Sequence, residues 1–278
     1  MSLTKIEPTA VRMHRSAAVT AFVALLLRDL TVLRKNVALF VVRTIMQPLL
    51  FVFVFTYVFP KIGQGIGPGR GGAAAFSSLL VPGVVAIACI FQGIQAVALP
   101  LVQEFSYTRE IEDRVMAPLP VWAVAVGKIV SGAIQGVLAS AVVFPLATVI
   151  LATPVTLDAV WSELLVILPL SALLGAALGL AIGTRAEARQ VPLVFSVIII
   201  PITFLGATYY PWASLSPIPW LKWAVLANPL VYMSEGFRIA LTPQFPHMTL
   251  PAIYGGLAGF TLILGWLGVQ GFKNRVLA

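Results

Sequence analysis

The stretch Glu104–Pro120, EFSYTREIEDRVMAPLP, decides how the rest of this chain is organised. Six of its first eleven residues are charged, although only 10% of the whole chain is charged. The stretch lies between two long apolar runs, which predicts a water-facing connection between two membrane helices. Val115 and Met116 can form the apolar side of a short helix, and the prolines that follow end it. Such a segment is either a docking surface for a soluble partner or a solvated loop that separates two helix ends, and the charges alone favour neither.

The composition predicts an all-α polytopic membrane protein. Of the 278 residues, 59% are apolar and the mean hydropathy is +0.98, whereas soluble domains are about 45–50% apolar. The net charge of +8 does not indicate nucleic-acid binding, because Lys and Arg collect in the cytoplasmic loops of membrane proteins. The single cysteine, Cys89, excludes an internal disulfide framework. The two histidines are far apart in sequence, so no metal site is expected.

Six apolar stretches are long enough to cross a bilayer, and together they form one transmembrane domain over residues 37–278. They lie at about residues 37–59, 76–101, 121–151, 164–183, 191–208 and 251–272. On this topology thirteen of the eighteen Lys and Arg residues fall on the side of the termini, and four fall on the other side. Both termini are therefore predicted to be cytoplasmic, in a multi-pass protein of the plasma (inner) membrane.

Residues 1–36 are predicted to be a cytoplasmic segment with an amphipathic helix. The apolar stretch Ala17–Leu27 is too short to cross the membrane. A signal peptide is the competing interpretation, but Arg28 and Asp29 follow at once without a small-residue cleavage site. We therefore expect a helix that lies in the membrane interface with its basic residues toward the headgroups.

The stretch Tyr209–Leu241 combines six Tyr and Trp residues with four prolines. Aromatic residues of this kind are typical of the membrane–water boundary, and the prolines prevent one continuous helix. The sequence predicts a re-entrant helical hairpin between the fifth and sixth spans. A true span over 224–241 is the alternative, but Glu235 and Arg238 make it costly unless the two side chains pair at their i, i+3 spacing.

The chain lacks the motifs of an energy-converting or hydrolytic enzyme. Its one Gly-Lys pair, Gly127-Lys128, is followed by Ile129 rather than Ser or Thr, and neither HExxH nor GxSxG occurs. The acidic residues lie mostly at the ends of the spans, which disfavours a proton-coupled secondary transporter. We expect the energy for any active transport to come from another subunit.

The order of these features resembles the permease of an ABC-2 type ABC exporter, over essentially the whole chain. The most specific segments are YTREIEDRVMAPLPVWAVAVGKI (Tyr107–Ile129) and FLGATYYPWASLSPIPWLKWAVLANPLVYMSEGFR (Phe204–Arg238). The family includes drug-resistance permeases, nodulation-factor exporters and polysaccharide or teichoic-acid exporters.

The resemblance implies a partner and a set of site residues. It implies that Glu104–Met116 is a coupling helix that docks on an ABC ATPase subunit through Glu104, Arg109, Glu110, Glu112, Asp113, Arg114 and Met116. It implies that Val11–Lys35 is the interface helix and that the hairpin includes Tyr210, Pro211, Trp212, Asn228, Pro229, Glu235 and Arg238. This chain would bind no cofactor, because ATP and Mg²⁺ belong to the partner. Two permeases, identical or related, would complete the exporter.

The substrate is the least constrained expectation. The sequence NPLVYMSEGFR is similar to the branch of the family that exports drugs and lipids, rather than to the branch that exports polysaccharides. A path between two permeases that includes Gln92, Gln95, Thr203 and Tyr209 would suit an amphipathic molecule, although each of these residues could equally pack helix against helix. An ion-coupled secondary transporter stays open as an alternative. A lipid-linked sugar transferase would need a clustered acidic site, for which only Asp158 and Glu163 are available.

Overall fold

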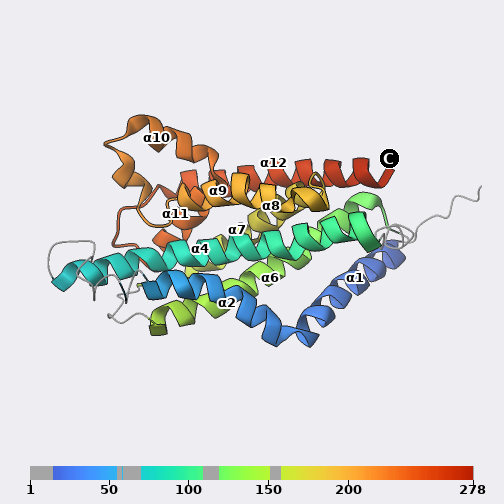
Figure 1. Ribbon diagram of the computed structural model, residues 1–278, viewed down its shortest axis with the longest axis horizontal. Helices are drawn as coiled ribbons and strands as arrows, with labels where there is room; N and C mark the ends of the chain where they lie inside the picture. Colours follow the sequence, from blue (N-terminus) through green and yellow to red (C-terminus); the bar gives the residue numbers. More distant parts are fainter. Residues whose placement is uncertain (1–14, 55–57, 59–69, 109–118, 151–157, 278) are drawn as a thin grey trace, which may run out of the picture.

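The computed structural model describes residues 15–54, 58, 70–108, 119–150 and 158–277 (Figure 1). Within these ranges the chain is helical and contains no β-strand, which confirms the predicted all-α class. The long helices are α1 (Arg15–Lys35), α2 (Val37–Phe53), α4 (Arg70–Gln103), α6 (Val121–Ile150), α7 (Trp161–Gly183) and α12 (Leu250–Leu277). The shorter ones are η2 (Glu104–Thr108), η3 (Ala188–Gln190), α8 (Val191–Val194), η4 (Phe195–Ile199), α9 (Ile200–Phe204), η5 (Trp212–Leu215), α10 (Pro219–Ala224), η6 (Val225–Ala227) and α11 (Pro229–Leu241).

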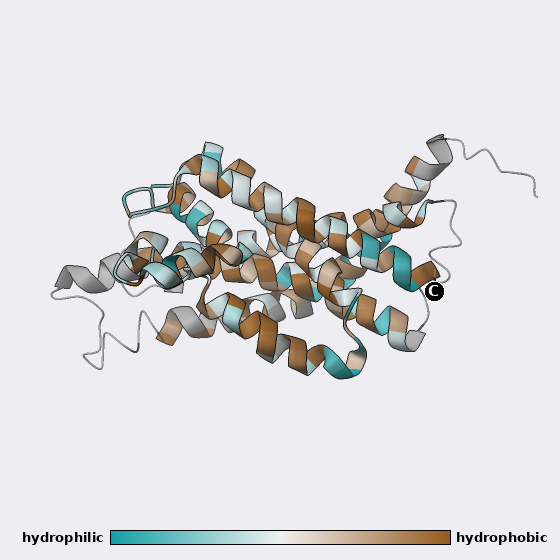
Figure 2. Ribbon diagram, turned by 90° about the horizontal axis from the view of Figure 1, so that it is seen from above, coloured by the Kyte–Doolittle hydropathy of each residue, from teal (hydrophilic) through white to brown (hydrophobic). Residues whose placement is uncertain are grey.

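The long helices form an elongated bundle around α7. Helix α7 packs against α4, α6, α11 and α12, and α4 also packs against α6. Helices α1 and α2 meet at an angle near Asn36 and cover one side of the bundle (Figure 1). Hydrophobic residues cover most of the helix lengths, and hydrophilic residues gather toward the helix ends (Figure 2). This pattern is expected of helices that cross a membrane side by side.

Four helices in the described part are long and apolar enough to cross a bilayer. They are Ser78–Ser106, Val121–Pro145, Trp161–Gly183 and Leu250–Leu277, and they match the second, third, fourth and sixth predicted spans. The first predicted span contains the 17-residue α2, and the fifth contains the short helices α8, η4 and α9. The six-span topology and the domain boundary at residue 37 therefore stay predictions, as does the position of α1 at a membrane surface.

Glycine permits a close contact between α4 and α7. A Cβ added to Gly93 would lie 2.5 Å from the backbone carbon of Gly175, and one added to Gly179 would lie 2.8 Å from the carbonyl oxygen of Gly93. Side chains at these positions would force the two helices apart. Of the Gly-xxx-Gly spacings in the sequence, that of Gly255 and Gly259 on α12 has open space around both residues.

The segment predicted as a re-entrant hairpin does not form one helix. It forms η5, α10, η6 and α11, which gather at the end of the bundle opposite the C-terminus (Figure 1). Helix α11 begins at Pro229, with Asn228 as its N-cap, so the alternative of a continuous helix over 224–241 is wrong. Nearly all of α11 is buried against α4, α7 and α12. Whether this hairpin dips into a membrane stays a prediction.

Candidate functional site

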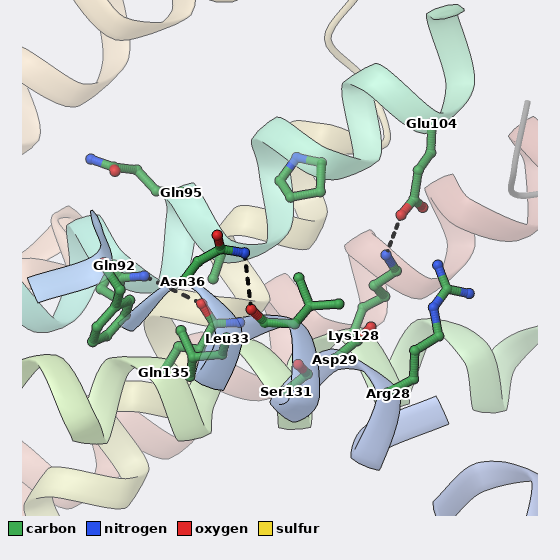
Figure 3. Close-up of a pocket in the computed structure, with 14 residues that line it drawn as sticks. Arg28, Asp29, Leu33, Asn36, Gln92, Gln95, Glu104, Lys128, Ser131 and Gln135 are labelled. Atoms are coloured by element: carbon green, nitrogen blue, oxygen red, sulfur yellow. Dashed lines mark hydrogen bonds and ion pairs between the residues drawn. The ribbon is translucent and has the colours of Figure 1, made fainter. Parts of the chain in front are cut away.

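The charged stretch begins inside the protein rather than on its surface. Glu104 lies directly after α4, in η2, and the Lys128 Nζ donates to its Oε1 at 2.7 Å. Both side chains are only 8% exposed. Glu104 therefore continues α4, and its carboxylate faces α6 (Figure 3). The other residues assigned to ATPase coupling, Arg109, Glu110, Glu112, Asp113, Arg114 and Met116, lie outside the described residues.

The Glu104–Lys128 ion pair joins the two helices that flank the charged connection. One helix enters the connection shortly after Glu104, and the other leaves it seven residues before Lys128, at Val121. Two buried charges of opposite sign stabilise each other strongly, whereas either one alone carries a large desolvation penalty. The pair therefore holds α4 and α6 together close to the point where the connection begins and ends.

A cavity of about 360 Å³ lies between α1, α2, α4 and α6. Its walls are polar at many positions, as Figure 3 shows for Arg28, Asp29, Asn36, Gln92, Gln95, Glu104, Lys128, Ser131 and Gln135. Val32, Leu33, Phe40, Ala96 and Pro100 supply its apolar surface. This volume is within the range of about 300–1,000 Å³ that is typical of small-molecule sites.

Hydrogen bonds tie the inner wall of this cavity together. The Thr44 hydroxyl donates to Gln92 Oε1 at 3.2 Å, and Gln92 Nε2 donates to Gln135 Oε1 at 3.4 Å. These contacts link α2, α4 and α6 through polar side chains. Such side chains are costly to bury unless they are hydrogen-bonded, as they are here. Gln92 therefore has a structural role as well as a place on the cavity wall.

The structure brings together two of the four residues predicted to line a path. Gln92 and Gln95 line the cavity, but Thr203 and Tyr209 are not among the described residues that form its walls. Thr203 is buried on α9, where its hydroxyl donates to the Ile199 carbonyl at 2.8 Å. The ring of Tyr209 lies 6.2 Å from that of Phe204.

A buried carboxylate organises the hairpin. Glu235 on α11 is fully buried, and its oxygens accept the backbone N–H of Trp212 at 2.9 Å and of Met248 at 2.7 Å. It also pairs with Arg238, as the i, i+3 spacing predicts. One side chain thus connects the start of η5, helix α11 and the segment before α12.

Arg238 and Asn228 extend this network to the segment that precedes the hairpin. Its Nη2 donates to the Ala207 carbonyl at 2.9 Å, at a residue whose φ is +52°. A non-glycine residue rarely adopts this left-handed conformation, so the surrounding contacts must hold it there. Asn228 Nδ2 donates to the Ile202 carbonyl at 2.7 Å, which fixes α11 against α9.

Hydrogen bonds, a cation–π contact and burial fix the remaining hairpin residues. Trp212 Nε1 donates to the Lys222 carbonyl at 2.9 Å, and the Lys222 ammonium lies 4.5 Å from the centre of the Trp212 ring. Pro211 and Pro229 are buried at the starts of η5 and α11, respectively. Burial raises the pKa of Tyr210 above its ordinary value.

Sequence reasoning did not single out Lys128, Ser131 or Gln135 as part of a site. Lys128 stands out in the sequence only as part of the Gly127-Lys128 pair, which lacks the Ser or Thr of a nucleotide-binding loop. One signal was available, because Glu104 and Lys128 lie at facing ends of consecutive spans. Gln135 gave no comparable signal, since an amide in a membrane helix can face a neighbouring helix anywhere along its length.

Comparisons with known proteins agree with this architecture. A family model described as ABC-2 type transporter matches residues 20–242, which include all the residues described in this section except Met248. The chain is 28% identical over 186 residues to inner membrane transport permease YadH of Escherichia coli strain K12, and equally to the protein of that name from Shigella flexneri. The match covers 64% of this chain and 66% of each relative, slightly less than two thirds of the relatives' length.

Proposed function

The chain belongs to the ABC-2 type transporter family, and we propose that it is the permease subunit of an ATP-driven exporter. Permeases of this family normally work with an ATPase subunit. The proposed substrate is an amphipathic drug-like molecule, lipid or glycolipid that leaves the cytoplasm or the inner leaflet. ATP and Mg²⁺ would bind to the ATPase, and two permeases, identical or related, would form the pathway.

The extent of the family match carries this proposal. It runs from α1 to the residue after α11 and includes the charged connection, the cavity and the hairpin. A match confined to the apolar helices would support a membrane protein of any class. The chain matches the family across its polar features as well, and these features are what a transport subunit needs in addition to its spans.

The Glu104–Lys128 pair supports a coupling role for the charged connection. A force that a soluble partner exerts on residues 109–118 reaches α4 and α6, since these helices continue from the two ends of the connection. The buried ion pair makes the two helix ends respond together. In this proposal Glu110, Glu112 and Asp113 pair with basic groups of the ATPase, and Met116 fills an apolar pocket on it.

The buried carboxylates argue against the ion-coupled alternative. Among the described residues, the buried acidic side chains are Glu104 and Glu235, and each has a cationic partner, Lys128 or Arg238. Both carboxylates are committed to ion pairs within the bundle, so neither is available as the intramembrane acid that an ion-coupled transporter needs.

Co-purification tests the proposed partnership. The chain, carrying a tag, is co-expressed with the ATPase encoded beside it, and the ATPase is expected to co-purify in a mild detergent. Glu110→Lys, Glu112→Lys and Asp113→Lys together are expected to abolish co-purification, because they place cations against the partner's basic groups. The matched control is Glu187→Lys, a reversal at an exposed carboxylate on another loop, and it should keep the ATPase bound. Absence of the ATPase from the wild-type sample would overturn the proposal.

A further inference from the structure

We propose that the cavity between α1, α2, α4 and α6 binds the uncharged, hydroxyl-rich headgroup of an amphipathic substrate, such as a glycoside. This inference rests on the proposed transport function and specifies the substrate class. The site lies within one copy of the chain, beside α1, and differs from the path that the sequence suggested through Thr203 and Tyr209.

The charges on the cavity wall select against a charged ligand. Arg28 and Lys128 supply two cations, and Asp29 and Glu104 supply two anions, so the described lining has no formal net charge. Lys128 and Glu104 are committed to each other at 2.7 Å. The lining has no excess positive charge that could neutralise a sulfated or phosphorylated headgroup. Such a headgroup would lose its hydration in the cavity without compensation, which makes its binding unfavourable.

Amide side chains supply the hydrogen-bonding capacity of the cavity. Asn36, Gln92, Gln95 and Gln135 all line it, and each amide carries both donors and acceptors. Gln135 Oε1 accepts from Gln92, while the Gln135 side chain is only partly buried. A headgroup with several hydroxyls can donate hydrogen bonds to such amides and accept hydrogen bonds from them at the same time. An apolar drug cannot form these hydrogen bonds.

The cavity also has a route for an alkyl chain. Val32 lines the cavity and is 54% exposed, and Phe40 lies on the same wall. Neighbouring apolar residues of α1 and α2, including Leu27, Val37 and Val42, are exposed as well. In a bilayer these side chains face lipid, so a tail can stay in the membrane while the headgroup occupies the cavity.

Photolabelling of the full-length chain tests this site. The protein is extracted directly into polymer nanodiscs, without sugar detergents that would compete, and exposed to an alkyl glucoside with a diazirine next to the sugar. The labelled peptides should come from α1, α4 and α6. A 6-sulfated glucoside with the same tail should label these peptides at least about tenfold less.

Two variants and a control make the test specific. Ala96→Phe fills the cavity and should abolish labelling, and Gln135→Leu removes hydrogen bonds and should lower it about fivefold. Gln270→Leu on α12 replaces a glutamine of similar burial outside the cavity and should leave labelling unchanged. Equal labelling of Gln135→Leu and Gln270→Leu, or of the neutral and sulfated probes, would overturn the site.

The same experiment separates this inference from the proposed function. Labelling requires neither ATP nor the ATPase. Intact labelling together with failure of ATP-driven transport would overturn the proposed function and leave the site standing. Intact ATP-driven transport by Ala96→Phe, with labelling lost, would overturn the cavity as the site of the transported substrate and leave the transport function standing.

Discussion

Glu235 shows how a single buried carboxylate determines a non-helical segment. The backbone of residues 205–218 has few regular hydrogen bonds, and Glu235 and Arg238 satisfy several of its donors and acceptors from α11. Removing either partner leaves a buried charge without its counter-ion, which costs about 3–5 kcal/mol. The hairpin geometry thus depends on two residues one helical turn apart.

We predict that Arg238→Ala strongly destabilises the protein. The buried Glu235 would lose its counter-ion, so the expected loss is about 3–5 kcal/mol of unfolding free energy, seen as a large fall in the midpoint of thermal unfolding in detergent. Arg189→Ala is the matched control, because Arg189 also forms an ion pair, with Glu187 at 2.7 Å, but its side chain is 81% exposed. Its midpoint should barely move. Similar midpoints for the two variants would contradict a structural role for Arg238.

The Glu104–Lys128 pair gives a second prediction at this scale. Lys128→Glu places two carboxylates together in a buried site, so little folded protein is expected by size-exclusion chromatography. Exchange of the two residues, Glu104→Lys with Lys128→Glu, restores opposite charges and should recover a substantial part of the folded yield. A double variant no better than the single one would show that the pairing itself contributes nothing.

The two ion pairs differ in how far the sequence could predict them. The i, i+3 spacing of Glu235 and Arg238 was sufficient, because one helix brings them together. The backbone partners of Glu235, at Trp212 and Met248, are brought to it only by the folded hairpin. No local sequence pattern predicts these two hydrogen bonds. Glu104 appeared to belong to a surface charge cluster, but the helical phase of α4 and η2 turns it toward α6.

At the scale of helices, small residues determine how closely α4 and α7 approach each other. We predict that Gly93→Ala destabilises the protein by about 1–3 kcal/mol, since the new Cβ would lie 2.5 Å from backbone carbon of Gly175. The control Gly259→Ala lies on α12 with open space around it, and it should be neutral or slightly stabilising. Thermal unfolding of the two variants in the same detergent compares them directly. Equal midpoints would contradict the close packing of α4 on α7.

The long helices were predictable, whereas the interrupted ones were not. Apolar runs near residues 76, 121, 164 and 251 produced helices of 23–29 residues, because length and hydrophobicity suffice for these. Residues 191–208 are similarly apolar, yet they form α8, η4 and α9 in succession. The sequence predicted the polar amides on the second span but not which helix each would face, since this depends on the packing of α1, α2 and α6.

At the scale of the whole molecule, different segments mark the two ends of the bundle. The hairpin lies at one end, and the C-terminus lies at the other (Figure 1). Cys89 is buried and is the only cysteine of the chain, so single cysteines introduced at the surface can report which end faces the cytoplasm. Because Cys89 is buried, it does not have to be replaced before these cysteines are introduced.

We predict that Ser214→Cys reacts with a membrane-impermeant maleimide in intact cells, because Ser214 is exposed on the hairpin end. Asn274→Cys, which is exposed near the C-terminus, should react only after the membrane is permeabilised, as the distribution of Lys and Arg requires. The unmodified chain, with Cys89 alone, is the control and should stay unlabelled. Labelling of Asn274→Cys in intact cells would reverse the proposed orientation.

The most direct test of ATP-driven export is transport into inverted membrane vesicles. Vesicles that contain this chain and its ATPase are given a fluorescent alkyl glucoside, with ATP or with a non-hydrolysable analogue. The account predicts accumulation that requires ATP hydrolysis and the ATPase and that persists when a protonophore collapses the proton gradient. Accumulation that follows the proton gradient and proceeds without the ATPase would contradict it and would identify an ion-coupled transporter instead.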